Sequence, residues 1–147
     1  MTLGEHLREL DVSNCQLHTQ GSRYIIDGMI RNRGLQFLNL ACNALNSATY
    51  EFAIKLAKIL TRHQSLMHLD LTATGLSKEE VIFIGMSLQH SCACVGLHLS
   101  LNQMSYYDRV FLRILMNAKV AFRFRNMAQK AGLRTQQEIN QVSELKS

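Results

Sequence analysis

The feature that most constrains the fold is an eleven-residue pattern, L-x-x-L-x-L-x-x-(N/C/T)-x-L, which occurs four times, with Val12, Cys94 and Met104 in place of leucine. The clearest copy runs from Leu66 to Leu76, and the others occupy residues 7–17, 35–45 and 94–104. The second leucine of the pattern falls at positions 10, 38, 69 and 97, so successive copies lie 28, 31 and 28 residues apart. Self-similarity at such a period is typical of solenoids, in which stacked units share one core.

Each copy has the alternation of a short strand followed by a turn. In the first copy Leu10 and Val12 alternate with polar residues, which predicts a strand with one buried face. The ninth position of the pattern holds Cys15, Asn43, Thr74 and Asn102 in the four copies. A small polar side chain there is expected to hydrogen-bond the backbone of the turn that leaves the strand.

Helical patterns follow the first two copies. A helix is expected over residues 19–32, and Gly34 is expected to cap its C-terminus. Its buried face is predicted to contain Tyr24, Ile25, Gly28 and Met29. The second helix, over residues 47–62, has an apolar stripe made of Phe52, Ala53, Leu56, Ile59 and Leu60. Its other face is charged, as expected of an amphipathic helix that covers a core.

The third and fourth helices are apolar on more than one side. Ser77 and Glu80 form a capping-box pattern before the third helix, and Ser105 begins a similar cap before the fourth, which is expected to end near residue 117. We expect Val81, Ile84, Leu88, Val110 and Ile114 to face inward, with Phe83, Met86, Phe111 and Leu115 at the side or outside. Neighbouring helices could cover these side chains, or they could form a convex protein interface.

The pattern weakens after the fourth helix. Residues 120–125 alternate apolar and polar side chains, which predicts a degenerate fifth strand with Phe122 and Phe124 inward. Residues 126–134 are expected to form a basic loop, followed by a short helix whose apolar stripe is Ile139, Val142 and Leu145. A helix this short must dock on the solenoid or on a partner. The predicted division is therefore a solenoid over residues 1–125 and a tail over residues 126–147.

These four patterns resemble the leucine-rich repeat family, and the unit length is similar to that of its ribonuclease-inhibitor-like subtype. The resemblance implies an α/β fold: a right-handed solenoid forming a short arc of four to five strand–helix units. Its parallel sheet would line the concave side and its helices the convex side. No cap precedes the first copy, so either the chain is a piece of a longer protein or a partner covers that sheet edge.

The residues between the leucines are expected to form a strip on the concave face. Its members are Glu9, Asp11, Phe37, Asn39, His68, Asp70, His98 and Arg123. Neighbouring parallel strands lie about 4.8 Å apart, so these residues would form columns that run from acidic to basic. We interpret the strip as a partner-binding surface with graded charge, and the alternative is that these are only solvated strand positions.

No motif for catalysis or nucleotide binding occurs in the chain. His68, Asp70 and His98 would lie close together, which leaves a zinc site or an acid–base pair as minor alternatives. Cys92 and Cys94 form a C-x-C sequence without the second pair that zinc would need. The sequence therefore predicts a non-enzymatic protein with no cofactor, no metal and no small-molecule substrate.

Charge and composition bear on the cellular compartment and on the class of partner. The net charge is +5, and Arg123, Arg125, Lys130 and Arg134 concentrate basic residues near the C-terminus. The sequence has no apolar run of about 18 residues that could span a membrane, and no pattern of a secretory leader. Because Cys15 also falls on an inward position of the pattern, we expect reduced thiols in an intracellular, cytoplasmic compartment. We predict a scaffolding subunit of a cytoskeletal, ciliary or organellar assembly that binds one or more proteins. The alternative is an RNA- or nucleoprotein-associated subunit that uses the basic residues.

Overall fold

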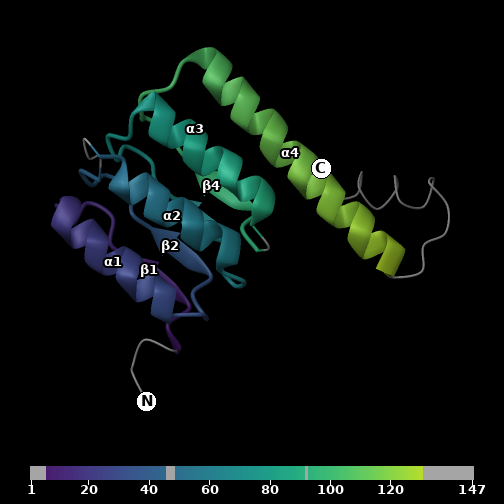
Figure 1. The fold of residues 1–147 in the computed structure, drawn as a ribbon, viewed down its shortest axis with the longest axis horizontal. Helices are drawn as coiled ribbons and strands as arrows, with labels where there is room; N and C mark the ends of the chain where they lie inside the picture. The colour runs from purple at the N-terminus through teal and green to yellow at the C-terminus, as the bar shows by residue number, and fades with distance from the viewer. Residues whose placement is uncertain (1–5, 46–48, 92, 131–147) are drawn as a thin grey trace.

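Four strand–helix units stack side by side in the computed structural model (Figure 1), which describes residues 6–45, 49–91 and 93–130. The elements in chain order are β1 (Glu9–Asp11), α1 (Thr19–Arg31), β2 (Phe37–Asn39), α2 (Glu51–Arg62), β3 (His68–Asp70), α3 (Lys78–Ser87), the 3-10 helix η2 (Leu88–His90), β4 (Gly96–His98) and α4 (Tyr106–Lys130). The α/β solenoid predicted from the repeated pattern is confirmed.

The strands form one parallel sheet in the order β1-β2-β3-β4. Leu10 pairs with Leu38, Leu38 with Leu69, and Leu69 with Leu97, so the four copies of the pattern are aligned without a slip. Helices α1, α2 and α3 lie next to one another and cover one face of the sheet (Figure 1). The opposite face carries the residues that alternate with the leucines along each strand.

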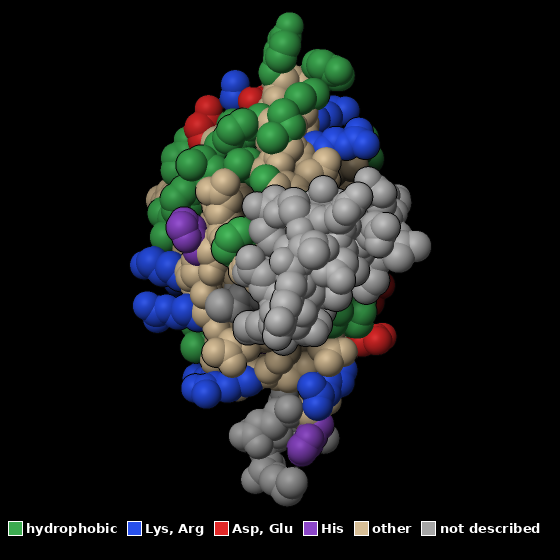
Figure 2. Space-filling view, turned by 90° about the vertical axis from the view of Figure 1, so that its right-hand side faces the viewer, with side chains coloured by type: hydrophobic (Ala, Val, Ile, Leu, Met, Phe, Trp, Pro, Cys, Tyr) green, Lys and Arg blue, Asp and Glu red, His purple; other side chains and the backbone are tan. Residues whose placement is uncertain are grey.

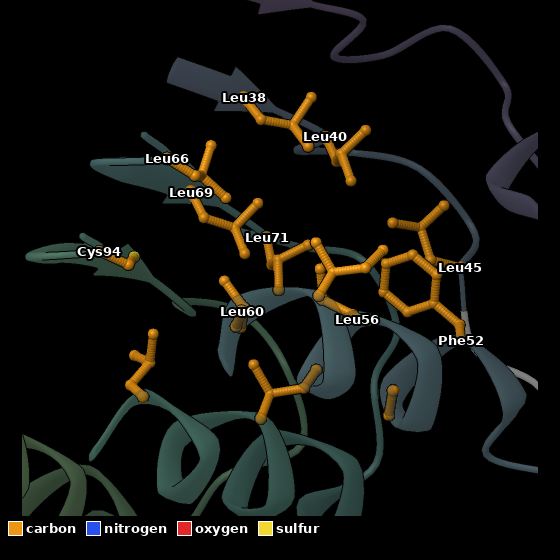
Figure 3. Packing of buried hydrophobic residues seen from close by; sticks show 14 of the residues in the cluster. Leu38, Leu40, Leu45, Phe52, Leu56, Leu60, Leu66, Leu69, Leu71 and Cys94 are labelled. Atoms are coloured by element: carbon orange, nitrogen blue, oxygen red, sulfur yellow. The ribbon is translucent and has the colours of Figure 1, made fainter. Parts of the chain in front are cut away.

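The core lies between the sheet and these helices. Figure 3 shows Leu38 and Leu69 reaching from their strands toward Leu56 and Leu60 of α2. The fully buried large side chains are Ile26, Leu38, Leu40, Leu45, Leu56, Leu60, Leu66, Leu69, Leu71, Leu76, Ile84 and Leu88. The predicted stripe of α2 is entirely buried, which confirms that interpretation. Each leucine is buried by the neighbouring units, so no single unit has a core of its own.

The turn after each strand follows a repeated geometry. Asn14, Cys42, Ala73 and Leu101, at the eighth position of the pattern, all have positive φ angles of 52° to 59°. The next position supplies the predicted hydrogen bonds, because Thr74 donates its hydroxyl to the Leu71 carbonyl (2.7 Å) and Asn43 donates to the Leu40 carbonyl (2.9 Å). Cys15 occupies that position in the first unit but is exposed, so the prediction of an inward thiol is wrong.

The buried face of α1 differs from the predicted one. Ser22, Ile26 and Met29 are buried, whereas Tyr24 is 69% exposed and Gly28 is also on the surface. The spacing of 22, 26 and 29 is the i, i+4, i+7 period of a helix face. A serine therefore holds a core position here, and Ile26 is buried while Ile25 is partly buried against the core.

A polar side chain ends each of the first three helical segments. Asn32 accepts hydrogen bonds from the backbone N–H of Gly34 (2.8 Å) and Leu35 (2.7 Å), and it takes the capping role predicted for Gly34. His63 accepts from the N–H of Leu66 at 3.1 Å. Ser91 accepts from the N–H of Cys94 at 3.2 Å in the same way. An acceptor three residues before the first position of the pattern therefore helps to turn the chain from helix to strand.

The predicted fifth strand does not form. Residues 120–125 belong to α4, a helix of 25 residues, and Phe122 is exposed. The capping acceptors lie at positions 32, 63 and 91, and the next step of 28 residues reaches Lys119. An ammonium group can only donate hydrogen bonds, so it cannot accept hydrogen bonds from the backbone N–H groups at the start of a new strand. Lys119 instead donates to the Cys94 carbonyl at 2.5 Å, and the helix continues.

The continuous helix changes the expectations for the C-terminal part. The loop predicted from residue 126 is helical as far as Lys130, and no break occurs at residue 125. Val110 and Ile114, predicted to face inward, are exposed, whereas Leu112 is buried. The tail helix predicted beyond residue 134 lies outside the described residues, so the division at residue 125 stays a prediction. No helix within the described ranges is long and apolar enough to cross a membrane.

Both predicted caps of the later helices are present. Ser77 accepts from the N–H of Glu80 (3.3 Å), and Glu80 accepts from the N–H of Ser77 (3.0 Å). In the same arrangement Asp108 accepts from the N–H (2.8 Å) and the hydroxyl (2.7 Å) of Ser105. Lys78 of α3 lies 3.4 Å from the Asp108 carboxylate, so this cap also joins α3 to α4.

The Asp108 cap predicts an acid-sensitive component of stability. The hydrogen bonds from Ser105 and the nearby Lys78 charge lower the pKa of Asp108 in the folded protein. A lowered pKa stabilises the fold above about pH 4, and this stabilisation is lost as the pH falls through the folded-state pKa. We expect Asp108→Asn to show a smaller fall in melting temperature between pH 7 and pH 3 than the wild type does. The control is Glu79→Gln, at an exposed position of α3. If the melting temperature of Asp108→Asn falls as far as those of the wild type and of this control, the Asp108 carboxylate makes no such contribution.

Candidate functional site

The concave strip predicted from the sequence is assembled by the sheet for all its members except Arg123. Strand pairing places the residues in two rows, Glu9–Phe37–His68–Gly96 and Asp11–Asn39–Asp70–His98. Because side chains alternate along a strand, both rows face away from the leucine core. These eight residues form the concave strip, and its role in binding is a prediction.

Two aromatic rings form the centre of the strip. The rings of Phe37 and His68 are stacked, with centroids 5.1 Å apart and an angle of 5° between their planes. Phe37 is 38% exposed, so the stacked pair is accessible to solvent on one side. The pair comes from neighbouring strands of a rigid sheet, so its geometry exists before any partner arrives.

Gly96 provides the space for this stack, which sequence reasoning did not identify. A Cβ atom at position 96 would lie 2.1 Å from Nδ1 of His68, so the imidazole ring leans over the bare backbone of β4. The missing side chain lets the ring lie flat beside Phe37. A glycine inside an otherwise regular strand pattern is the signal for such a close approach.

The second row is held by hydrogen bonds along the strip. Asn39 donates to the Asp11 carboxylate at 3.0 Å. Asp11 and Asp70 each accept from the backbone N–H two residues ahead, at 2.9 Å and 2.8 Å. The N–H and hydroxyl of Ser13 lower the pKa of Asp11. These contacts orient the polar side chains, so the strip is an ordered surface.

The strip is acidic, and the prediction of a charge gradient is wrong. Arg123 was expected to make the last strand basic, but it lies in α4 and is not part of the sheet. The charged residues that remain in the two rows are Glu9, Asp11 and Asp70, and neither row contains lysine or arginine. The charged side chains of the strip are therefore all carboxylates.

The imidazole–carboxylate neighbourhood offers no metal site. His68, Asp70 and His98 do lie on adjacent strands as expected. However, no group of three or more His, Cys, Asp or Glu side chains within residues 6–45, 49–91 and 93–130 is arranged to hold a metal ion. His68 is instead used in the ring stack, and Asp70 accepts from the Thr72 N–H.

The convex candidates Phe83, Met86 and Phe111 are exposed, as predicted. They lie on α3 and α4, which pack against each other. Hydrophobic side chains gather in the upper part of Figure 2, at the height of the N-terminal half of α4 in Figure 1. The tail candidates Ile139, Val142 and Leu145 lie outside the described residues.

Three of the four basic C-terminal residues belong to α4 and not to a strand. Arg123 and Arg125 lie within α4, and Lys130 is its last residue. Arg134 is beyond the part of the chain that the structure describes. The alternative of nucleic-acid binding through these residues stays a prediction.

Comparison with known proteins is informative about the fold. A family model described as Leucine Rich Repeat matches residues 6–28, which contain β1 and most of α1. No curated protein matches the sequence. Among solved structures, the chain is similar to the tropomodulin C-terminal domain of Caenorhabditis elegans, with a TM-score of 0.56 and 14% sequence identity. The similarity covers 84% of this chain and 91% of the tropomodulin domain.

Proposed function

We propose that this chain, which folds as a leucine-rich-repeat solenoid, is a non-enzymatic interaction module that binds a partner protein through the concave strip. The proposed occupant is a partner segment that carries a lysine or arginine. The module would act as a structural subunit of a larger intracellular assembly.

The observation that carries this proposal is the exposed Phe37–His68 stack. Aromatic residues that are rigid before binding lose little conformational entropy on contact, and they are frequent hot spots of protein interfaces. Here the stack is supported from below by Gly96 and lies beside carboxylates of β1 and β3. A basic side chain could lie over the rings while its charge is matched by Asp11 or Asp70.

The convex residues support a second contact within the same assembly. Phe83, Met86 and Phe111 are large apolar side chains on the outer surface of two packed helices. Exposed apolar groups on neighbouring elements are typical of surfaces that associate with other proteins. A scaffold needs more than one contact, so two separate surfaces agree with a structural role.

For the setting we propose a cytoskeletal assembly, with ciliary and organellar assemblies as the other settings that the repeat family suggests. The shared fold with a tropomodulin domain supports the cytoskeletal choice. The proposed location is the cytoplasm.

Binding measurements on strip variants test the proposal. Proteins captured by the immobilised full chain would be identified, and each dissociation constant would be measured with purified components. We expect Phe37→Ala to weaken partner binding by about tenfold or more, as removal of a central aromatic anchor does. Gly96→Ala should weaken binding as well, because the new Cβ displaces His68 from the stack.

The control is Tyr24→Ala, which removes an exposed aromatic ring from α1 on the other side of the sheet. It should leave the dissociation constant unchanged. If Phe37→Ala and Gly96→Ala bind the partner as tightly as the wild type and Tyr24→Ala do, the concave strip is not the interface.

A further inference from the structure

A groove opens between α1 and α2 on the helix side of the molecule, and it belongs to neither surface described above. Its volume is about 550 Å³. It is lined by Met29, Ile30, Asn32, Arg33, Lys55, Lys58, Ile59, Arg62, His63, Gln64 and Ser65. This volume is within the range of about 300–1,000 Å³ that is usual for ligand pockets.

The groove is basic at its rim. Arg33, Lys55, Lys58 and Arg62 contribute four positive charges, and no aspartate or glutamate is among the lining residues. Lys55 is paired with Glu51 of the same helix at 2.9 Å. For Arg33, Lys58 and Arg62, the structure shows no ion pair within the described residues. A ligand with carboxylates would therefore meet cations that are not already neutralised.

The groove is apolar in its interior. Met29 and Ile59 are buried side chains of α1 and α2, and Ile30 is 61% exposed beside them. His63 belongs to the wall, because its Nε2 donates to the Asn32 carbonyl (2.7 Å) and its Nδ1 accepts from backbone N–H groups. The groove thus combines apolar contacts in its interior with long cationic side chains around its edge.

From this combination we infer that the groove binds an acidic amphipathic segment of a partner protein. Apolar residues of the segment would contact Ile30 and Ile59, and its glutamates or aspartates would reach Lys58 and Arg62. This surface is distinct from the concave strip, so the inference goes beyond the proposed function. Variants of the concave strip test the proposed function, and variants of the groove test this inference, so either one can be rejected without the other.

The helix ends favour a peptide over a compact polyanion. Both α1 and α2 end beside the groove, after Arg31 and Arg62, and the residues that follow each helix are part of its lining. Helix C-termini carry partial negative charge and do not favour a phosphate seated among them. Carboxylates on flexible side chains can instead stay at the rim, where the cations are.

The test uses a fluorescent amphipathic peptide made of leucine and glutamate, titrated with the full chain and followed by fluorescence anisotropy. We expect saturable binding that weakens with added salt. The double variant Lys58→Glu/Arg62→Glu should raise the dissociation constant by about tenfold or more, since it makes the rim repel the peptide. Ile30→Ser should weaken binding several-fold without changing any charge.

The matched control is Arg109→Glu/Arg113→Glu, which makes the same change in net charge on the exposed surface of α4. It should bind the peptide as the wild type does. If it loses as much affinity as the groove variant, the attraction is only that of net charge and the inference fails. Tighter binding to phosphatidylserine vesicles or to single-stranded RNA than to the peptide would also overturn it.

Loss of folding is separated from loss of binding by the melting temperature of each variant. If Lys58→Glu/Arg62→Glu melts early, Lys58→Gln/Arg62→Gln replaces it, because it removes the charges without introducing repulsion. That variant should still weaken binding several-fold, and unchanged affinity would contradict the proposal.

Discussion

Replacing Leu69 with alanine is expected to lower the free energy of unfolding by about 3–4 kcal/mol, because it leaves a cavity in a fully buried site. Leu69 has no exposed surface and pairs with Leu38 on one side and Leu97 on the other. Its loss therefore weakens the contact between three neighbouring units. Urea unfolding followed by circular dichroism would measure the change.

Met67→Ala is the matched control for this substitution. Met67 lies two residues away, just before β3, and is 40% exposed. Its truncation should cost less than about 1 kcal/mol, as is usual at surface positions without special contacts. If the two variants were equally stable, the leucine core would not hold the units together as the packing in Figure 3 indicates.

The second large effect is expected for Asn102→Ala. The Asn102 side chain accepts from the backbone N–H of Thr74 (3.1 Å) and Leu76 (3.0 Å). It donates to the carbonyls of Leu71 (2.7 Å) and Leu99 (3.1 Å). Alanine would leave several buried backbone groups unpaired, and each such group costs about 1–3 kcal/mol. We therefore expect the free energy of unfolding to fall by roughly 3 kcal/mol or more.

Asn39→Ala and Asn102→Thr make this prediction specific. Asn39 makes fewer hydrogen bonds, on the exposed side of the sheet, so its loss should cost less. Threonine occurs naturally at the same position of the third unit, where Thr74 donates to the Leu71 carbonyl. Asn102→Thr should therefore be intermediate. If Asn102→Ala were as stable as Asn39→Ala, the hydrogen bonds of Asn102 would not hold the units together.

Asn102 also shows why the sequence pattern was an incomplete guide. The pattern predicted that a polar side chain at this position would bond its own turn, and the bond to the Leu99 carbonyl confirms it. The bonds to residues 71, 74 and 76 belong to the preceding unit, and Asn43 makes the same kind of contact with the first unit through the N–H of Leu17. These bonds depend on the stacking distance between units, which a pattern within one unit does not contain.

The candidate sites show the same division. Strip residues from Glu9 to His98 could be predicted because strand register follows from the leucines. The flat stack of Phe37 on His68 could not, since it depends on the space above Gly96 in a strand 28 residues further along the chain. The groove between α1 and α2 was also missed, because its cations come from α2 and from the segment after α1, whose spacing is set by packing.

The sequence by itself determined the repeating unit, the strand register and most of the leucine core, because burial of one strand face requires a period of two and stacking requires a fixed repeat. Only the tertiary structure decided that residues 120–125 do not form a fifth strand. Residues 120–125 have a strand-like alternation, yet they extend α4, since Lys119 donates to the Cys94 carbonyl and offers no acceptor to begin another strand. The charge of the concave strip follows from that contact, because the arginine expected to make it basic never joins the sheet.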